Sequence, residues 1–179
     1  MVTNKGCTAL TWAVDKGLEK VCEILIPNMS EQAINHVNNN GSTALTLAAW
    51  KGLEKICRLL IPKMSPQAIN HVTNNGNTAL TLAAWKGLEK ICELLIPKMS
   101  SQAINQVTNN GDTALTLAAW KGLEKICEML IPKMSEQAIN QVTNNGNTAL
   151  TLAADKSLEK ICEMLIPKMS KQAINHMAL

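Results

Sequence analysis

The sequence predicts an all-α repeat solenoid, in which short helix pairs stack side by side and a tight turn closes each unit. One phrase of 35 residues recurs five times without a linker, over 8–42, 43–77, 78–112, 113–147 and 148–179. Each copy holds two short apolar segments, and Asn-Gly turns separate successive copies. Because one such unit cannot bury its apolar face alone, the copies must stack, and we expect a single repeat domain over 1–179.

The first segment of a unit, TALTLAAW, predicts a helix that begins after a threonine N-cap such as Thr78. We expect this helix to end where a glycine allows a left-handed C-cap, at Gly52, Gly87 and Gly122. Its core-facing residues in the third unit are assigned to Leu80, Leu82, Ala83 and Ala84.

The second segment, LEKICELLI at 88–96, has apolar residues at helical spacing and is followed by Pro97, which we expect to end the helix. One further helical turn is predicted next, with Ser65 as N-cap and Pro66 at the first helical position in the second unit. The stretch VTNNGN then predicts a hairpin turn, because Asn-Gly suits the backbone that such turns need. We name this turn the finger.

The composition limits the classes of protein to which the chain can belong. Hydrophobic residues make up 46% of the chain and aromatic residues only 2%, so we expect an aliphatic core. The formal net charge of +3 is too balanced to favour nucleic acid or an anionic membrane as a partner. No secretory signal and no apolar run long enough for a membrane span is evident, which favours a cytoplasmic location.

Five of the six cysteines recur once per unit, at Cys22, Cys57, Cys92, Cys127 and Cys162. Equivalent points on stacked helical repeats lie roughly 10 Å apart. A disulfide needs Cα atoms within about 7 Å. We therefore expect free thiols, in keeping with a reducing compartment.

No pattern in the sequence points to catalysis, a metal or a cofactor. A cysteine nucleophile needs a base within hydrogen-bond reach, whereas the histidines fall in the return segment, away from the cysteine helix, at His36, His71 and His176. The sequence has neither a C-x-x-C pair nor a phosphate-binding G-x-x-x-x-G-K-[ST] loop. We expect no enzymatic activity.

The order of helix, glycine turn, helix and Asn-Gly finger resembles the ankyrin repeat. The family pattern reads G-x-T-P-L-H-x-A-A-x-x-G-H, then a helix ending in L-L, then a V-N-A-like return. This sequence has GNTALTLAAWKGL at 76–88, LL at 94–95 and INQV at 104–107, and the resemblance covers essentially the whole chain. Alanine replaces the proline of the pattern, as at Ala79, and threonine replaces its histidine, as at Thr81.

The missing histidine removes the side chain that usually joins neighbouring turns in this family. The resemblance implies an elongated rod of stacked units that binds other proteins. Near-identical tandem arrays also look like those of intracellular bacteria that act on host proteins.

The resemblance places a tryptophan and a lysine of each central unit on the concave side, as the pairs Trp50 and Lys51, Trp85 and Lys86, and Trp120 and Lys121. Three tryptophans in register predict a strip of rings about 10 Å apart beside a row of lysines. Two interpretations stay open. The rings are exposed and bind a partner, or each ring lies flat on the neighbouring repeat and only packs. Aspartates take this position in the outer units, at Asp15 and Asp155.

The same resemblance places the finger tips on the groove side, including Asn74, Asn75, Asn77, Asn109, Asn110 and Asp112. Amide side chains there offer hydrogen bonds in both directions to a partner. The alternative is that asparagine is simply what a tight turn prefers.

Together these observations predict a non-enzymatic scaffold without a cofactor, which binds a protein partner through the tryptophans, the lysines and the finger tips. It is expected to be a monomer or to associate weakly end to end, in a bacterial cytosol or in a host cytosol after delivery. The alternative is a structural or engineered consensus-like array with no partner of its own.

Overall fold

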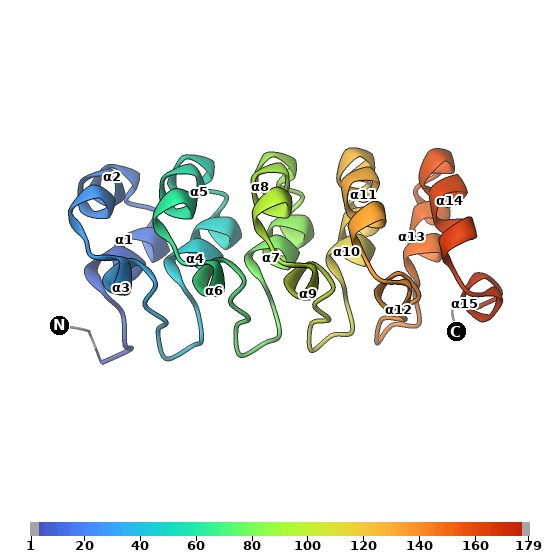
Figure 1. Ribbon diagram of the computed structural model, residues 1–179, viewed down its shortest axis with the longest axis horizontal. Helices are drawn as coiled ribbons and strands as arrows, with labels where there is room; N and C mark the ends of the chain where they lie inside the picture. Colours follow the sequence, from blue (N-terminus) through green and yellow to red (C-terminus); the bar gives the residue numbers. More distant parts are fainter. Residues whose placement is uncertain (1–3, 177–179) are drawn as a thin grey trace.

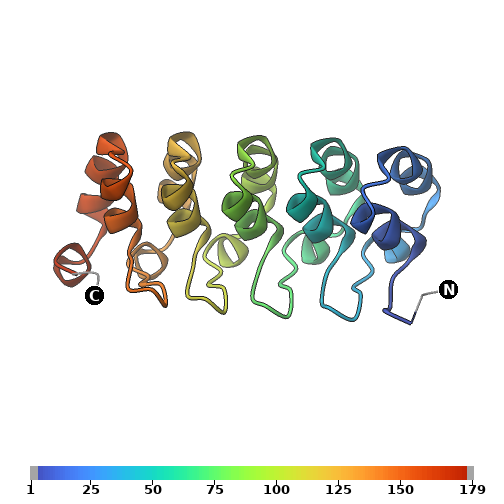
Figure 2. The same cartoon turned by 180° about the vertical axis from the view of Figure 1, so that it is seen from behind.

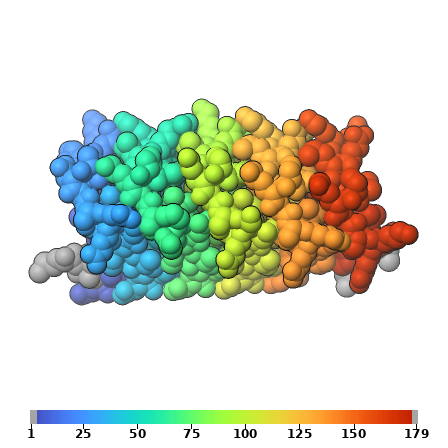
Figure 3. Space-filling model, viewed as in Figure 1, coloured from blue at the N-terminus to red at the C-terminus, as the bar shows by residue number. Residues whose placement is uncertain are grey.

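The computed structural model describes residues 4–176, in which five pairs of helices follow one another along the chain. The pairs stand in a row, and the chain progresses from one end of the row to the other (Figure 1). In that part of the chain all regular structure is helical, with no strand, so the predicted all-α repeat solenoid is confirmed. From behind, the fingers descend side by side below the helices (Figure 2). The space-filling view shows that the repeats form one continuous body (Figure 3).

The inner helices form one layer of the row. They are α1 (Ala9–Asp15), α4 (Ala44–Lys51), α7 (Ala79–Lys86), α10 (Ala114–Lys121) and α13 (Ala149–Asp155). Each begins after the predicted threonine N-cap. In α7, Thr78 accepts from the backbone N–H of Thr81, and the Thr81 hydroxyl accepts from the backbone N–H of Thr78 in return. The threonine that replaces the family histidine thus completes a reciprocal cap.

The outer helices form the second layer. They are α2 (Glu19–Asn28), α5 (Glu54–Leu60), α8 (Glu89–Leu95), α11 (Glu124–Leu130) and α14 (Glu159–Leu165). The predicted glycine C-caps precede three of them, with left-handed backbones at Gly52, Gly87 and Gly122. A short helix then follows in every unit, as α3 (Glu31–Ile34), α6 (Pro66–Ile69), α9 (Ser101–Ile104), α12 (Glu136–Ile139) and α15 (Lys171–Ile174).

The prolines end the outer helices less abruptly than predicted. Each outer helix from α5 onward passes into a 3-10 turn that contains the proline, as η1 (Ile61–Lys63), η2 (Ile96–Lys98), η3 (Ile131–Lys133) and η4 (Ile166–Lys168). In α2 the helix runs through Pro27 to Asn28, whose side chain donates to the carbonyl of Ile24 at 2.8 Å. A proline at the end of a helix leaves few N–H groups to lose, so the chain tightens instead of breaking.

The core lies between the two layers and runs through all repeats. Inner helices pack on inner helices, outer on outer, and each pair packs within itself. The buried apolar side chains are almost all Leu, Ile, Ala, Met and Cys, as the composition predicts, and the threonines that cap the inner helices are buried beside them. The five cysteines of the one-per-repeat column are free thiols, buried from Cys22 to Cys127 and half-buried at Cys162.

Three columns of side-chain hydrogen bonds join neighbouring repeats. The first repeats the bond between the side chain of Asn74 and the carbonyl of Asn39 in the preceding finger, at 3.2–3.4 Å along the array. In the second, Asn70 accepts from the backbone N–H of Ser100, and equivalent pairs recur. The third joins His71 to the carbonyl of Gly41, with equivalents at His36 and His176. The turns are therefore bonded to each other although the family histidine is absent.

Candidate functional site

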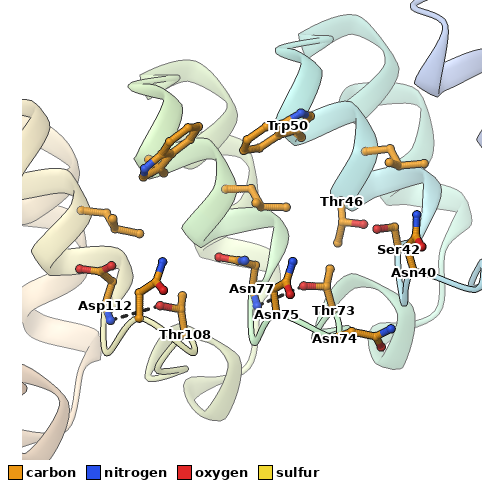
Figure 4. A pocket seen from close by; sticks show the side chains of 15 residues that line it. Asn40, Ser42, Thr46, Trp50, Thr73, Asn74, Asn75, Asn77, Thr108 and Asp112 are labelled. Carbon is orange, nitrogen blue, oxygen red and sulfur yellow. Dashed lines mark hydrogen bonds between the residues drawn. The ribbon is translucent and has the colours of Figure 1, made fainter. Parts of the chain in front are cut away.

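A groove of about 610 Å³ crosses the second to fourth repeats between the inner helices and the fingers (Figure 4). Trp50 and Trp85 line one side of it. Leucines of the inner helices lie next to them, at Leu47, Leu82 and Leu117. The opposite side is polar and comes from the fingers, with Asn40, Ser42, Thr73, Asn74, Asn75, Asn77, Thr108, Asn110 and Asp112. The groove thus combines an apolar wall with an amide-rich edge.

Two of the three tryptophans stack directly on each other. The ring centroids of Trp50 and Trp85 are 5.0 Å apart, and the planes differ by 9°. The predicted ring spacing of about 10 Å is wrong for this pair, because the spacing of helix axes does not fix where long side chains point. All three rings remain about 40% exposed, at 39% for Trp50 and 41% for Trp85 and Trp120. Packing and exposure therefore coexist at this surface.

The lysines of the strip occupy three different environments. Lys86 Nζ lies 4.1 Å from the ring centroid of Trp50 and 4.9 Å from that of Trp85. Lys121 Nζ lies 4.3 Å from the ring centroid of Trp120 in its own repeat. Lys51 reaches back to Asp15, at 3.7 Å between Nζ and Oδ1. Lys51 therefore contacts the carboxylate of Asp15, whereas Lys86 and Lys121 contact the electron-rich faces of tryptophan rings.

The finger tips divide into two groups. Asn74 and Asn109 use their side-chain amides to bond the preceding finger. Asn75 and Asn110 line the groove and make no side-chain hydrogen bond within the described part of the chain, so these amides are available to a partner.

Asn77 and Asp112 occupy equivalent places in successive fingers and accept from the hydroxyls of Thr81 and Thr116 at 3.3 and 3.5 Å. Partial burial raises the pKa of the Asp112 carboxyl, and the bond from Thr116 lowers it in part. Asp112 is the only acidic residue that lines the groove.

Sequence reasoning missed part of the apolar wall. Leu82 was assigned to the core, yet Leu47 and Leu82 are only partly buried and also line the groove. The spacing holds the signal, because Leu47 lies three residues before Trp50 and so shares its helix face. Trp12 takes the place of this leucine in the first repeat and is 42% exposed.

The described residues contain no group of three or more His, Cys, Asp or Glu side chains that could hold a metal ion. Among residues 4–176, no helix has both the length and the apolar character to cross a membrane. Burial raises the pKa of the Cys57, Cys92 and Cys127 thiols to about 12, so these groups stay protonated at neutral pH. A protonated, buried thiol is a core side chain and a poor nucleophile.

A family model described as ankyrin repeats (3 copies) matches the sequence in four overlapping placements, at residues 1–70, 30–106, 64–141 and 99–177. The chain belongs to the ankyrin-repeat family. Ankyrin repeats are generally protein–protein interaction modules, and the family is typically non-enzymatic.

Two Rickettsia proteins share short stretches with this ankyrin-repeat chain. An ankyrin repeat protein of Rickettsia felis (strain ATCC VR-1525 / URRWXCal2) is 90% identical over 30 residues, which are 17% of this chain and 10% of that protein. An ankyrin repeat protein of Rickettsia bellii (strain RML369-C) is 69% identical over 35 residues, which are 20% of this chain and 6% of that protein. Each match thus spans a tenth or less of the relative's length.

Proposed function

We propose that this ankyrin-repeat chain binds an extended segment of a partner protein in the groove of the second to fourth repeats. The observation that carries the proposal is the stacked Trp50 and Trp85 pair, which is about 40% exposed on the groove wall. Tryptophan is enriched among the residues that dominate binding energy at protein interfaces. A stacked pair presents a large apolar area that is already ordered, so little side-chain entropy opposes contact.

The polar edge of the groove orients the partner segment. Asn75 and Asn110 can each donate and accept, which suits the alternating N–H and C=O groups of an extended backbone. Asp112 lines the polar side of the groove, and the ammonium group of Lys86 lies over the Trp50 and Trp85 rings of the other side, so a partner segment with matching charges is held in one direction.

The array itself supplies rigidity. Its three columns of hydrogen bonds and its continuous core keep the groove-lining side chains in place before a partner arrives. We infer a site of action in a cytoplasm, either of a bacterium or of its host, because the free thiols suit a reducing compartment and the relatives come from Rickettsia.

The test is site-specific photo-crosslinking in eukaryotic cytosolic lysate, followed by identification of the crosslinked protein. A photoreactive residue at position 110 in the groove is compared with one at Lys90 on an outer helix, as the matched control. A protein crosslinked from position 110 but not from position 90 is expected. This crosslink should weaken at least about tenfold in a folded Trp50→Ala, Trp85→Ala variant, in line with truncation of interface anchors.

Equal crosslinking from both positions, or a crosslink that the double variant leaves unchanged, would show that the groove is not the binding surface. Absence of a crosslink from either position would favour the second candidate function, a structural array without a partner of its own. Circular dichroism of each variant establishes that it is folded before the comparison is made.

A further inference from the structure

The two end faces of the array carry apolar side chains whose counterparts inside the array are covered. Ile166 in the fifth repeat is 48% exposed, whereas its counterparts are 1–7% exposed, at Ile26, Ile61, Ile96 and Ile131. Val21 in the first repeat is 41% exposed, whereas its counterparts are at most 2% exposed, at Ile56, Ile91, Ile126 and Ile161. These faces lie at opposite ends of the row (Figure 1).

We name the two surfaces by their residues. The C-face consists of Leu150, Ala154, Cys162, Ile166 and Ile174, all half-buried or exposed. The N-face consists of Ala9, Leu18, Val21 and Leu25, also half-buried or exposed. Residues of both faces belong to the packed helices, to the N-cap of α2 at Leu18 and to the 3-10 turn that follows α14, and none lines the groove.

The C-face repeats, residue for residue, a surface that is covered inside the array. Its counterparts in the fourth repeat are Leu115, Ala119, Cys127, Ile131 and Ile139, all buried at the junction with the fifth repeat. The N-face likewise matches Ala149, Leu158, Ile161 and Leu165, with Val21 in place of an isoleucine. The internal junction is therefore a template for a contact between the two end faces.

Polar groups at the two ends are complementary in the same register. Lys160 pairs with Glu128 across the junction of the last two repeats, at 2.7 Å, and Lys125 with Glu93 at 2.6 Å. The corresponding groups at the ends are Lys20 beside the N-face and Glu163 beside the C-face. Neither forms an ion pair within the described residues.

We propose that a second copy of this chain stacks its N-face on the C-face of the first and so repeats the internal junction. Lys20 of the added copy then pairs with Glu163, as Lys160 does with Glu128. The contact joins two different surfaces, so it leaves one of each free and generates linear chains of copies instead of a closed dimer.

This association is weaker than the internal junctions. Repeats of one chain are already tethered, whereas separate copies lose translational and rotational freedom when they stack. We therefore expect assembly that grows with protein concentration and reverses on dilution. The proposal is independent of the groove, because none of the groove-lining residues belongs to either face.

Sedimentation velocity and equilibrium over a wide concentration range test the proposal with three substitutions. Ile166→Lys places a charge on the C-face, and Val21→Lys places one on the N-face. Both side chains are already largely exposed, so the fold should tolerate the change. Leu59→Lys is the matched control, since Leu59 is an exposed apolar residue of α5 in the second repeat.

The parent chain and Leu59→Lys are expected to form species larger than dimers as concentration rises. Each face variant alone should associate at least about tenfold more weakly. Mixed together, the two face variants should form a one-to-one dimer and nothing larger, because one intact C-face then meets one intact N-face. A parent chain that stays monomeric at millimolar concentration would overturn the proposal, and so would association that neither face substitution weakens.

Discussion

Trp50 and Trp85 stack across the junction of the second and third repeats, and the ammonium group of Lys86 lies within 5 Å of both ring centroids. Trp85 and Trp120 occupy the same repeat positions one junction further along, but no ring contact joins them. Near-identical repeats thus present two different surfaces, one a closed aromatic pair and one a separate ring. The difference allows the pair to be tested against an internal control.

We expect Trp50 and Trp85 to be energetically coupled. A double-mutant cycle of alanine substitutions should give a coupling of about 0.5–1.5 kcal/mol, the usual value for aromatic pairs. The same cycle on Trp85 and Trp120 should give a coupling close to zero, since these rings do not touch. Urea unfolding followed by far-ultraviolet circular dichroism measures both cycles. Similar couplings for the two pairs would mean that the stacking contributes nothing specific.

The series of ion pairs between neighbouring outer helices is interrupted at Arg58. Lysine pairs with a glutamate of the preceding repeat at Lys55–Glu23, Lys125–Glu93 and Lys160–Glu128. Arg58 takes the place of that glutamate in the second repeat and instead pairs with Glu54 in its own helix, at 2.7 Å. Lys90 is left without an ion pair among the described residues.

Arg58→Glu should restore the missing ion pair with Lys90 and raise the free energy of unfolding. The gain should be about 0.2–1 kcal/mol, since the pairs are exposed, and the lost bond to Glu54 offsets part of it. Glu93→Arg, which breaks the ion pair with Lys125, should lower stability. Thermal unfolding at low and high salt is the measurement, and both effects should shrink with salt. A gain that salt does not reduce would contradict an electrostatic origin.

Two glycines with the same left-handed backbone should respond differently to alanine. A Cβ at Gly76 in the finger would lie 2.9 Å from the backbone nitrogen of Asn109, whereas a Cβ at Gly122 meets nothing within 4 Å. Gly122→Ala should cost on the order of 1–2 kcal/mol, the penalty of the left-handed region. Ser157 already adopts that region at φ 56°, so the fold tolerates it.

Gly76→Ala should cost clearly more than Gly122→Ala, because the neighbouring finger must also move and the bond from Asn109 to Asn74 is strained. Denaturant unfolding gives the two free energies, and amide hydrogen exchange at the fingers shows where the damage lies. An equal loss of unfolding free energy for the two substitutions would mean that the neighbouring finger can move aside at no energetic cost.

The buried thiols make stability depend on alkaline pH. Burial raises the pKa of Cys57, Cys92 and Cys127 to about 12, above that of an exposed thiol. The unfolded chain therefore loses these protons first as the pH rises. Stability from this source is complete below the unfolded pKa and is lost progressively up to pH about 12, by about 1.4 kcal/mol per pH unit for each thiol.

A Cys57→Ala, Cys92→Ala, Cys127→Ala variant should be less stable at pH 7 because of the methyl-sized cavities, yet show a flatter decline above pH 9. Denaturant unfolding between pH 7 and 11 gives the free energy of unfolding of the parent chain and of the variant as the pH rises. In the parent chain at neutral pH, these thiols should react with a thiol reagent only as fast as the fold opens. Rapid reaction of all cysteines in the native state would contradict their burial.

Local signals predicted most of the fold. Thr78 caps its helix and Gly87 ends it because caps and left-handed turns depend on only a few neighbouring residues. The stacking order of the helices followed from the repeat alone, since each unit needs a neighbour to bury its apolar face. Proline was overestimated as a stop signal only at Pro27, where α2 continues to Asn28, whereas α5 ends at Leu60, before Pro62.

The site was predicted only in part. The sequence indicated the tryptophan and lysine positions, and the structure places Trp50 and Trp85 on a groove wall. It could not show that the rings touch, because ring position depends on side-chain rotamers and on the lysine of the next repeat. Nor could it separate Asn74, which bonds the preceding finger, from Asn75, which lines the groove without such a bond, since both belong to the same turn.

The packing of each repeat mainly on its neighbours has a mechanical consequence. A pull on the two ends reaches every junction in series, and no junction shields another. The junctions share nearly the same residues, so we expect the array to lengthen by one repeat at a time, in steps of similar size and force. The junction at Arg58 lacks its ion pair and should yield among the first. We expect the extended molecule to shorten again after release, because each unfolded repeat can stack on the one still folded.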